Sequence, residues 1–409
     1  MQYQDQTLYL EQVALADIAH REGTPCYVYS RSNILERYQA YDQAFGAVPH
    51  KICYAVKANS NLAILKLLAE AGAGFDIVSG GELFRVLEAG ADPAAVIFSG
   101  VGKTADELDY AIRHHIRSFN CESEPELALL DSLAARHAFQ ARVAIRVNPD
   151  VDAATHPYIS TGLRKHKFGI DIHAAEAVYE RARALSNLVL EGVSCHIGSQ
   201  IVDIEPLIEV FDKMVALVER LRSRGFPIRT LDLGGGLGVP YKPGDKALGI
   251  SEFVQAMCQR VEGHGLEVLI EPGRSIVAEA GLLLTRVLYR KTNGDRQFVI
   301  VDAAMNDLIR PALYHAHHEI VPLRLNQAGT ITADVVGPVC ESGDFLARGR
   351  EMANVLPGDL LAVCTAGAYG FVAASNYNAR PRPPEILVEG AGYRVVRKRE
   401  TYQDLIRGE

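Results

Sequence analysis

Residues 51–59 read Lys51-Ile-Cys-Tyr-Ala-Val-Lys57-Ala-Asn59, and this stretch decides how the rest of the chain is interpreted. The run as far as Val56 is apolar and rich in β-branched and aromatic residues, which is typical of a buried strand. Lys57 stands where that strand should end. Loss of hydration there favours the neutral amine, which can attack a carbonyl group and form a Schiff base. The alternative is a surface lysine just beyond a strand. The residues elsewhere in the chain distinguish a Schiff-base lysine from a surface lysine.

Short apolar runs alternate with amphipathic stretches, such as Asn61 to Ala71, Asp106 to Arg113 and Leu207 to Arg224, along the first two thirds of the chain. Eight strand–helix units over this length predict an α/β fold of the (β/α)8 barrel type. An open doubly wound sheet shows the same alternation, but no reversal of strand order is evident, so we favour the barrel. We expect its strands at residues 51–56, 74–78, 95–99, 117–120, 142–147, 191–196, 229–233 and 267–271.

The rhythm changes after residue 277. Strand-like runs follow with few helical patterns between them, which predicts a second, mainly β domain with strands at 297–301, 320–325, 330–336, 359–365 and 385–388. The opening segment ends in a strand-like run, 24–30, and we expect it to pair with this second domain. A helix should follow, with Asn33 and Glu36 at the spacing of a capping box. The predicted domains are 33–277 for the barrel, and 1–32 with 278–409 for the β domain.

Composition places the chain among globular proteins and excludes several classes. A chain of 409 residues is long enough for two domains, and 48% hydrophobic with 22% charged residues is ordinary. The net charge of −8 provides no basic surface for nucleic acid or membrane, and no apolar run is long enough to span a bilayer. The seven cysteines are scattered without a Cys-x-x-Cys pair. This argues against disulfides and a metal site, and for a cytoplasmic location without a signal peptide.

Reactive side chains gather at the predicted ends of the barrel strands. In a (β/α)8 barrel the catalytic groups come from the carboxyl ends of the strands and from the loops that follow them. A set of Lys, Asp, Arg, His and Glu at these ends therefore indicates an active site. The residues at these positions are Lys57, Asp76, Ser79 to Glu82, Arg146, His196, Ser199, Gly234 to Gly238 and Glu271 to Ser275.

Each of these groups has a physical role if the Schiff-base partner of Lys57 is pyridoxal phosphate. The glycines at 234–238 allow backbone N–H groups to approach a phosphate, and Gly273 with Arg274 offers further donors. Glu271 can keep a pyridine nitrogen protonated, which makes the ring the electron sink that decarboxylation needs. His196 can lie flat against a ring face. Structural alternatives remain open for each: a tight turn, an ion pair with an arginine, and a hydrogen-bonded core histidine.

The predicted β domain carries a second group of polar residues. Arg310 and Tyr314 are four residues apart and can face one site. Cys340 and Glu341 lie among turn-forming residues, and Tyr369 is flanked by small ones. Arginine for a carboxylate, a thiol to deliver a proton and a phenol to contact phosphate or ring would complete a decarboxylase site. Surface salt bridges, an inert buried cysteine and a packed tyrosine are the alternatives.

Together these motifs resemble the bacterial diaminopimelate decarboxylases, which belong to the alanine-racemase-like (fold type III) class of pyridoxal phosphate enzymes. The resemblance runs from about residue 24 to about residue 390. Ala304 and Ala379 depart from it, where a glycine and a serine would be expected, and neither has an evident catalytic role. The motifs are Tyr54 to Asn59, His196 to Gln200, Gly234 to Gly238, Glu271 to Arg274, Arg310 to Tyr314, Cys340 to Asp344 and Gly367 to Gly370.

The resemblance implies a role for each matching residue. Lys57 would hold pyridoxal phosphate covalently, His196 would stack on its ring, and Cys340 would return a proton to the substrate. The remaining cofactor contacts would come from Asp76, Ser199, Gly235, Gly236, Glu271, Pro272, Gly273, Arg274 and Tyr369. The substrate's distal end would be bound by Arg274, Arg310, Tyr314, Glu341 and Tyr369. The resemblance also implies a homodimer in which the Cys340 loop reaches the neighbouring subunit's site, and a mobile loop at His156 to Gly169 that covers the site.

The activity that the resemblance implies is decarboxylation of meso-2,6-diaminopimelate to L-lysine and carbon dioxide, the last step of lysine synthesis. A related decarboxylase for ornithine, arginine or a carboxylated polyamine is the first alternative, but a substrate without a distal carboxylate has no use for Arg274 and Arg310. Glu271 argues against a racemase on the same barrel. A non-catalytic pyridoxal phosphate-binding protein is a further alternative. Proteins of that kind resemble the barrel alone, so the β domain with its Cys340 cluster argues against it.

Overall fold

The computed structural model describes residues 1–151 and 167–409, and these divide into two compact units. The first, called the barrel unit below, comprises Arg37–Val239 and Lys246–Ser275. The second, called the sheet unit, comprises Met1–Glu36, Pro240–Asp245 and Ile276–Glu409. Most of the predicted covering loop, residues 156–166, lies outside the described residues.

The barrel unit is a closed ring of parallel strands, as predicted. Each strand pairs with the next along the chain, and the ring closes because β13 pairs with β5. The short β10 (Ile170–Asp171) extends the sheet beside β9. The strands of the ring are β5 (His50–Ala55), β6 (Gly74–Ile77), β7 (Val96–Phe98), β8 (Ser118–Cys121), β9 (Ala141–Asn148), β11 (Leu188–Ser194), β12 (Thr230–Asp232) and β13 (Glu267–Ile270).

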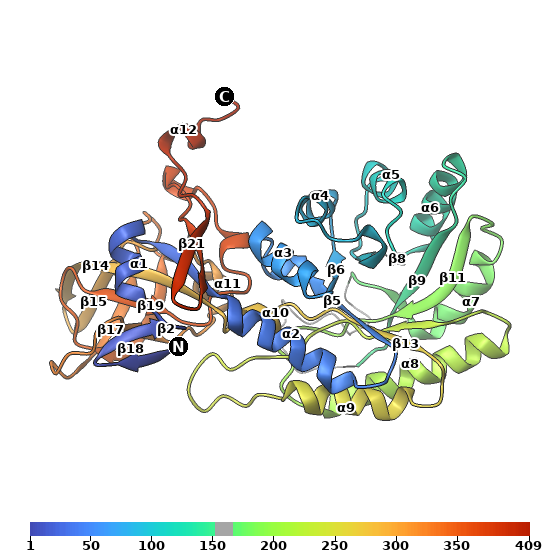
Figure 1. Ribbon diagram of the computed structural model, residues 1–409, viewed down its shortest axis with the longest axis horizontal. Coiled ribbons are helices and arrows are strands. Elements are labelled where there is room, and N and C mark those ends of the chain that lie inside the picture. The colour runs from blue at the N-terminus through green and yellow to red at the C-terminus, as the bar shows by residue number, and fades with distance from the viewer. Residues whose placement is uncertain (152–166) are drawn as a thin grey trace. The chain divides into compact units, whose positions relative to one another are not determined.

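Helices lie on the outer side of these strands (Figure 1). Side-chain caps set the starts of several of them: the Ser79 hydroxyl accepts the N–H of Glu82, and Thr104 forms a full capping box with Glu107. The helices are α2 (Arg31–Phe45), α3 (Leu62–Glu70), α4 (Gly80–Glu88), α5 (Ala105–Arg113), α6 (Glu124–Arg136), α7 (Ile172–Ala182), α8 (Glu205–Ser223) and α9 (Ile250–Val261). The short α10 (Arg274–Val277) and the 3-10 turns η1 (Val56–Ala58) and η2 (Pro93–Ala95) lie in the connections before or after strands.

The predicted capping box of Asn33 and Glu36 was wrong. Helix α2 already begins at Arg31, and the Ser30 hydroxyl accepts the N–H of Asn33 at 3.1 Å. Ser30 ends the buried strand β4 and is itself held by the carboxylate of Glu11 at 2.7 Å. A serine already fixed at a strand end thus caps the helix first, and Asn33 falls inside its opening turn.

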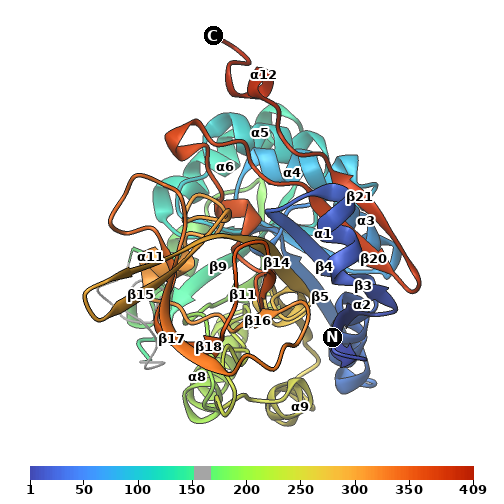
Figure 2. The same ribbon diagram turned by 90° about the vertical axis from the view of Figure 1, so that its left-hand side faces the viewer.

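The sheet unit is mainly β, as predicted, and its main sheet runs in the order β18-β17-β15-β14-β4-β20-β21. The opening segment does pair with it: β4 (Cys26–Ser30) lies between β14 and β20, as Figure 2 shows in blue beside red for β4 and β20. The other strands are β14 (Gly281–Asn293), β15 (Arg296–Val301), β16 (Ile320–Pro322), β17 (Thr330–Val336), β18 (Phe345–Ala353), β19 (Leu360–Val363), β20 (Glu385–Glu389) and β21 (Gly392–Arg397).

Smaller elements complete the sheet unit, and one core ties its first and last segments together. Leu15, Ile18, Val28, Leu284 and Ile386 belong to a single buried apolar cluster. No helix in the described ranges combines the length and the apolar character needed to cross a membrane. The smaller elements are β1 (Gln2–Gln4), β2 (Thr7–Leu10), β3 (Val13–Ala14), α1 (Leu15–Glu22), α11 (Arg310–Tyr314), α12 (Tyr402–Leu405), η3 (Phe371–Ala373) and η4 (Tyr377–Ala379).

Candidate active site

Lys57 lies just beyond the carboxyl end of β5, in the 3-10 turn η1. Its ammonium nitrogen donates a hydrogen bond to Oδ2 of Asp76 at 2.6 Å. The register of the barrel explains this contact, because Ala55 at the end of β5 pairs directly with Asp76 on β6. Asp76 is fully buried, whereas Lys57 is 34% exposed. The lysine is thus held by one buried carboxylate and still reachable from outside.

The second carboxylate oxygen of Asp76 is buried without a hydrogen bond. Its Oδ1 finds no donor in the described part of the chain. An unpaired buried carboxylate oxygen is unfavourable by roughly 1–3 kcal/mol or more. The mouth of the barrel therefore carries an acceptor suited to a donor that comes from a ligand.

A second acidic group lies at the ends of β12 and β13. Glu271 accepts hydrogen bonds from the Ser99 hydroxyl at 3.1 Å and from the Asn120 amide at 3.3 Å. The same Asn120 amide donates to Asp232 at 2.8 Å, and the other Asp232 oxygen accepts the N–H of Gly234 at 2.9 Å. One amide thus bridges the two buried carboxylates.

Burial makes both of these carboxylates difficult to ionise. Burial and the negative charges of Asp232 and Asp76 raise the pKa of Glu271 well above its usual value, although Lys57 and Arg146 act against this. Burial likewise raises the pKa of Asp232 to about 6. A cationic N–H group placed against Glu271 would allow it to ionise, so the pair is suited to a protonated ring nitrogen.

His196 follows strand β11 with its ring in the neutral form. The backbone N–H of Gly235 donates to its Nδ1 at 3.3 Å, so the ring proton belongs on Nε2. Burial and the positive charges of Arg146 and Lys57 lower the pKa of His196 well below its usual value. A neutral imidazole is the form that can cover the face of an aromatic ring without bringing a charge.

The glycine-rich turn after β12 packs directly against two neighbouring turns. A Cβ on Gly235 would collide with the backbone carbonyl of Glu271, and one on Gly236, where φ is +107°, would lie 2.6 Å from the carbonyl oxygen of Gly198. Only glycine permits this approach. The turn therefore brings backbone without side chains to the carboxyl end of the barrel, and such backbone can bind phosphate through its N–H groups. The N–H groups of Gly234 and Gly235 already donate to Asp232 and His196, so a phosphate there would compete with these two contacts.

Arg274 opens α10 and is 6% exposed. Its guanidinium donates to the Ser199 hydroxyl at 2.9 Å through Nη2 and at 3.3 Å through Nε. This contact joins the predicted residues of two different strand ends. A hydroxyl carries no charge, so the Ser199 contact orients Arg274 without neutralising it.

Several residues around this site were not predicted as site residues. Glu122 forms a buried ion pair with Arg146 at 2.8 Å and accepts the N–H groups of Gly100 and Gly169. Asn120 and Asp232 interrupt otherwise apolar strands, and that interruption is the signal that could have found them. For Glu122, which follows a strand among loop residues, the sequence offers no comparable signal.

In the sheet unit, Arg310 is the first residue of α11 and is 7% exposed. Its Nη1 lies 2.9 Å from Nε2 of His318, and its guanidinium carbon lies 4.5 Å from the centre of the Tyr241 ring. Tyr314 ends the same short helix and is half-buried. His318 and Tyr241 were not predicted.

The predicted Cys340 loop is exposed at its reactive residues. Cys340 is exposed, and its backbone N–H donates to the Asn378 side chain at 2.7 Å. The carboxylate of exposed Glu341 accepts a hydrogen bond from the Tyr377 hydroxyl at 3.2 Å, which raises the pKa of that phenol. Asp344 fixes the base of the loop by accepting the N–H of Val339 at 2.7 Å.

The predicted site residues therefore fall into two sets. The structure links Lys57 with Asp76, His196 with Gly235, and Ser199 with Arg274, all within the barrel unit. The sheet unit holds the other set: Arg310, Tyr314, Cys340, Glu341 and the half-buried Tyr369, whose φ of +56° lies in the left-handed region.

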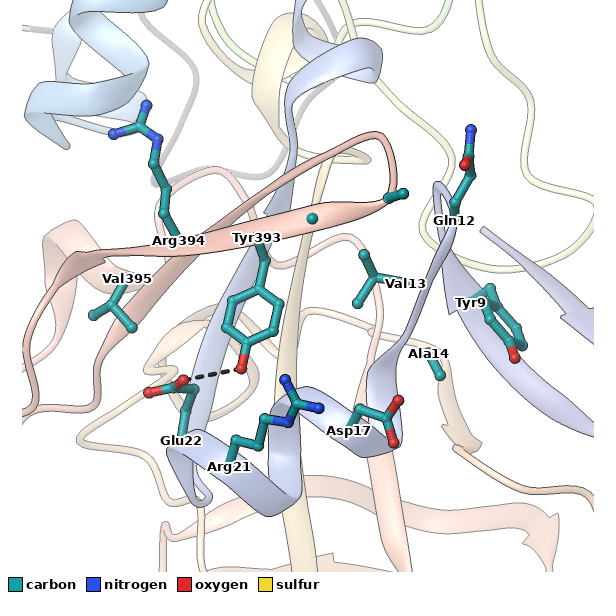
Figure 3. Close-up of a pocket in the computed structure, with 12 residues that line it drawn as sticks. Tyr9, Gln12, Val13, Ala14, Asp17, Arg21, Glu22, Tyr393, Arg394 and Val395 are labelled. Carbon is teal, nitrogen blue, oxygen red and sulfur yellow. Dashed lines mark hydrogen bonds between the residues drawn. The ribbon is translucent and has the colours of Figure 1, made fainter.

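A pocket of about 730 Å³ lies in the sheet unit, between α1 and the β20–β21 hairpin (Figure 3). Charges of both signs line it, and the Tyr393 hydroxyl bridges it by a 3.0 Å hydrogen bond to Glu22. Of the described residues that line this pocket, none was predicted as a site residue, so it does not enter the chemistry below.

A half-buried amine beside a carboxylate, an acid pair suited to a ring N–H and a glycine turn without side chains near the phosphate position meet the needs of pyridoxal phosphate. The barrel unit thus has the features of a pyridoxal phosphate-binding domain. A family model described as "Pyridoxal-dependent decarboxylase, pyridoxal binding domain" matches residues 31–278.

Similar proteins of known name identify the kind of pyridoxal-dependent decarboxylase that the chain resembles. The chain is 54% identical over 407 residues to a diaminopimelate decarboxylase of Pseudomonas aeruginosa, covering 100% of this chain and 98% of that protein. Among solved structures, a Helicobacter pylori diaminopimelate decarboxylase complexed with L-lysine matches with a TM-score of 0.92, 42% identity and coverage of 96% and 98% of the two chains. One from M. jannaschii, also with L-lysine, matches with a TM-score of 0.95, 38% identity and coverage of 99% and 96%. The chain belongs to the diaminopimelate decarboxylase family.

Proposed function

We propose that this chain decarboxylates meso-2,6-diaminopimelate to L-lysine and carbon dioxide, and that it closes lysine biosynthesis. The observation that carries the chemistry is the Lys57–Asp76 contact at the mouth of a barrel that also buries Glu271. The choice of substrate is supported by similarity to diaminopimelate decarboxylases over the full chain.

The cofactor site follows from the barrel residues. Lys57 would attach pyridoxal phosphate, His196 would cover one ring face, and Glu271 would accept the ring N–H. The phosphate would bind at Gly235 and Gly236, with further contacts from the remaining predicted residues Asp76, Ser199, Pro272, Gly273, Arg274 and Tyr369. When bound, this cofactor supplies an electron sink that stabilises the negative charge left on carbon as carbon dioxide departs.

Glu271 contributes to that chemistry through its charge. As a carboxylate it favours the protonated ring nitrogen, and the buried position keeps water from weakening this interaction. Asp76 would hold the Lys57 ammonium whenever Lys57 is not attached to the cofactor. Neutral His196 adds no charge that would compete with the ring.

The substrate's distal end would be recognised by the arginines and by groups of the sheet unit. Arg274 and Arg310 with Tyr314 would bind the distal carboxylate, Glu341 would bind the distal ammonium, and Tyr369 would contact cofactor and substrate. The two ends of the substrate differ only in stereochemistry, so these contacts decide which end reacts.

Cys340 would supply the proton. The bond between the α-carbon and its carboxylate breaks, the electron pair stays with the carbon, and carbon dioxide leaves. The Cys340 thiol then gives its proton to that carbon and is itself reprotonated from solvent. The products, L-lysine and carbon dioxide, account for every atom of the substrate.

The proposed assembly is a cytoplasmic homodimer with shared active sites, and 33–277 is proposed as the cofactor-binding domain. Exposure of Cys340 and Glu341 on a single chain supports the dimer. The seven cysteines are all free thiols, which fits a reducing compartment.

The test is carbon dioxide release by the purified protein with added pyridoxal phosphate. The substrates would be meso-, LL- and DD-diaminopimelate, ornithine, arginine and lysine. We expect release from the meso form only, with L-lysine as the product. Release from ornithine or arginine would retain the cofactor chemistry but contradict the proposed substrate, and no release from any of them would revive a non-catalytic binding protein.

Lys57→Ala provides the variant and Lys51→Ala its control. Lys51 lies on β5, the strand that Lys57 follows, and donates to the carbonyl of Gly72 instead. We expect Lys57→Ala to lower turnover by about a thousandfold or more. It should also abolish trapping of the cofactor on the protein by borohydride, measured by mass spectrometry. Trapping that survives in Lys57→Ala would place the attachment on another lysine.

A further inference from the structure

His318 is a fully buried histidine at the centre of a hydrogen-bonded chain in the sheet unit. Its Nδ1 lies 2.8 Å from the backbone carbonyl oxygen of Cys364, and its Nε2 lies 2.9 Å from Nη1 of Arg310. Cys364 follows strand β19, so the chain of contacts runs from the sheet to the first residue of α11. The imidazole therefore connects Arg310 to a rigid element.

The chemistry of these contacts fixes the state of the ring. A backbone carbonyl only accepts hydrogen bonds, so Nδ1 must carry a proton. A guanidinium only donates, so Nε2 must be bare. His318 is therefore a neutral imidazole protonated on Nδ1, and it orients Arg310 without bringing a negative charge that would neutralise it.

Tyr241 fixes the second direction of the guanidinium. Its ring centre lies 4.5 Å from the guanidinium carbon, in a cation–π contact, and it meets the His318 ring edge-on at a centroid distance of 5.3 Å. The hydrogen bond to His318 fixes how the Arg310 guanidinium is rotated within its own plane. The Tyr241 ring, stacked on the guanidinium, fixes the orientation of that plane. Tyr241 follows the predicted phosphate-binding glycines by three residues in the chain.

We propose that His318 and Tyr241 are positioning residues that aim Arg310 at the carboxylate of the substrate's distal end. The inference rests on the proposed function, because it takes Arg310 as the group that reads this carboxylate. An internal aspartate or glutamate would hold the arginine as firmly but would compete with the substrate. A neutral acceptor and an aromatic face hold it without that competition.

The test compares two ligands that differ in one carboxylate, L-lysine and 1,5-diaminopentane. Binding of each to the holoenzyme is measured by calorimetry for the wild type and for His318→Leu. We expect His318→Leu to weaken L-lysine binding about tenfold while 1,5-diaminopentane changes by less than about twofold. His318→Gln retains an acceptor for Arg310 and should give a smaller loss, which keeps the test usable if the leucine variant does not fold.

The neighbouring histidine is the matched control. His317 contacts Glu319 at 3.1 Å and Arg350 at 3.0 Å. His317→Leu should therefore leave the ratio of the two affinities unchanged. Tyr241→Leu, with His318 intact, should move the ratio in the same direction as His318→Leu.

The outcomes separate the two proposals. Equal losses for both ligands in His318→Leu would mean a structural role and overturn the inference, as would no loss for either. If the wild-type holoenzyme binds both ligands equally, Arg310 does not bind the distal carboxylate. That result would contradict this part of the proposed function and the inference that rests on it.

Discussion

Asp232 is the residue whose charge most directly affects Glu271. The negative charge of Asp232 is the largest contribution, after burial, to the raised pKa of Glu271. The Asn120 amide holds both carboxylates at once, so they cannot move apart to relieve the repulsion. Without a cation at Glu271, this arrangement destabilises the folded chain at neutral pH, and a bound pyridinium would offset that cost.

The first prediction concerns Asp232→Asn in the apoprotein. The pKa of Asp232 is raised from 3.8 to about 6, so the folded state holds this proton more tightly than the unfolded state does. Its contribution to stability is therefore present below about pH 4 and is lost as pH rises through about 6. We expect Asp232→Asn to be more stable than the wild type above that pH, by on the order of 1–3 kcal/mol, with the difference shrinking in acid.

Urea unfolding of the two apoproteins at a series of pH values measures this difference. Asparagine can still accept the N–H of Gly234, but its NH2 group then replaces the oxygen that accepts from the Asn120 amide. The loss of that hydrogen bond costs the same at every pH, so the change of the stability difference with pH is the quantity that reports on the ionisation of Asp232. A stability difference that stays constant with pH would show that the ionisation of Asp232 is not its source.

Whether a residue of the candidate site could be predicted from the sequence depended on where it lies. Lys57 and His196 stand at predicted strand ends, and they were predicted because Lys, Asp, Arg, His and Glu gather at these ends as a set. Asp232 ends β12 and Asn120 lies within β8; both break an apolar pattern in the same way, but they were not predicted. His318 is held by a backbone carbonyl 46 residues away, and no local spacing encodes such a contact.

Among the elements, the glycine turn after β12 gives the sharpest prediction. We expect Gly235→Ala to be destabilised by about 1–3 kcal/mol, because a Cβ there collides with the carbonyl of Glu271. The same shift would also weaken cofactor binding. Gly102→Ala is the control, since a Cβ on exposed Gly102 meets nothing within 4 Å. It should stay within about 0.5 kcal/mol of the wild type.

Chemical unfolding of the apoproteins and titration with pyridoxal phosphate measure the two effects of Gly235→Ala. A Gly235→Ala protein with wild-type stability and wild-type affinity would mean that the turn can move aside. The proposed backbone contact with the phosphate would then have to be abandoned.

Strands whose residues are apolar throughout were predicted, and strands that change from apolar to polar along their length were missed. All eight barrel strands are confirmed, because each is a short apolar run between helices. In the sheet unit, β14 was missed although it is the longest strand in the described residues, at 13 residues. Its first half is buried and its second half exposed, so neither periodicity runs through it. Strand β18 contains the charged Arg348-Gly-Arg350 and pairs with register shifts.

At the scale of the whole molecule, the two units are interleaved along the chain. Strand β4 precedes the barrel in sequence yet lies between β14 and β20, which follow it. Residues Pro240–Asp245 likewise leave the barrel segment and belong to the sheet unit. The sheet unit cannot be completed until both ends of the chain are present, so neither unit corresponds to one continuous piece of sequence.

The last prediction tests the shared active site of the proposed homodimer. Lys57→Ala should lack the attachment of the cofactor, and Cys340→Ala should bind the cofactor normally but turn over slowly. Each variant alone is therefore expected to be nearly inactive. If Lys57 of one subunit works with Cys340 of the other, a mixed dimer has one intact site and one site with both defects. Equal mixing with random exchange should then restore about a quarter of wild-type activity, because about half of the dimers are mixed and half of their sites are intact.

The activity of the mixture, measured against time and protein concentration, distinguishes the possible assemblies. Recovery that follows the rate of subunit exchange supports sites built from two chains. If Lys57 and Cys340 of the same chain work together, mixed dimers contain no site with both residues, and activity should stay at the level of the single variants. If the protein sediments as a monomer and is fully active, the proposed homodimer is wrong. The exposure of Cys340 and Glu341 on a single chain would then require a different explanation, since an exposed thiol is a poor place to protonate a carbanion that water can also reach.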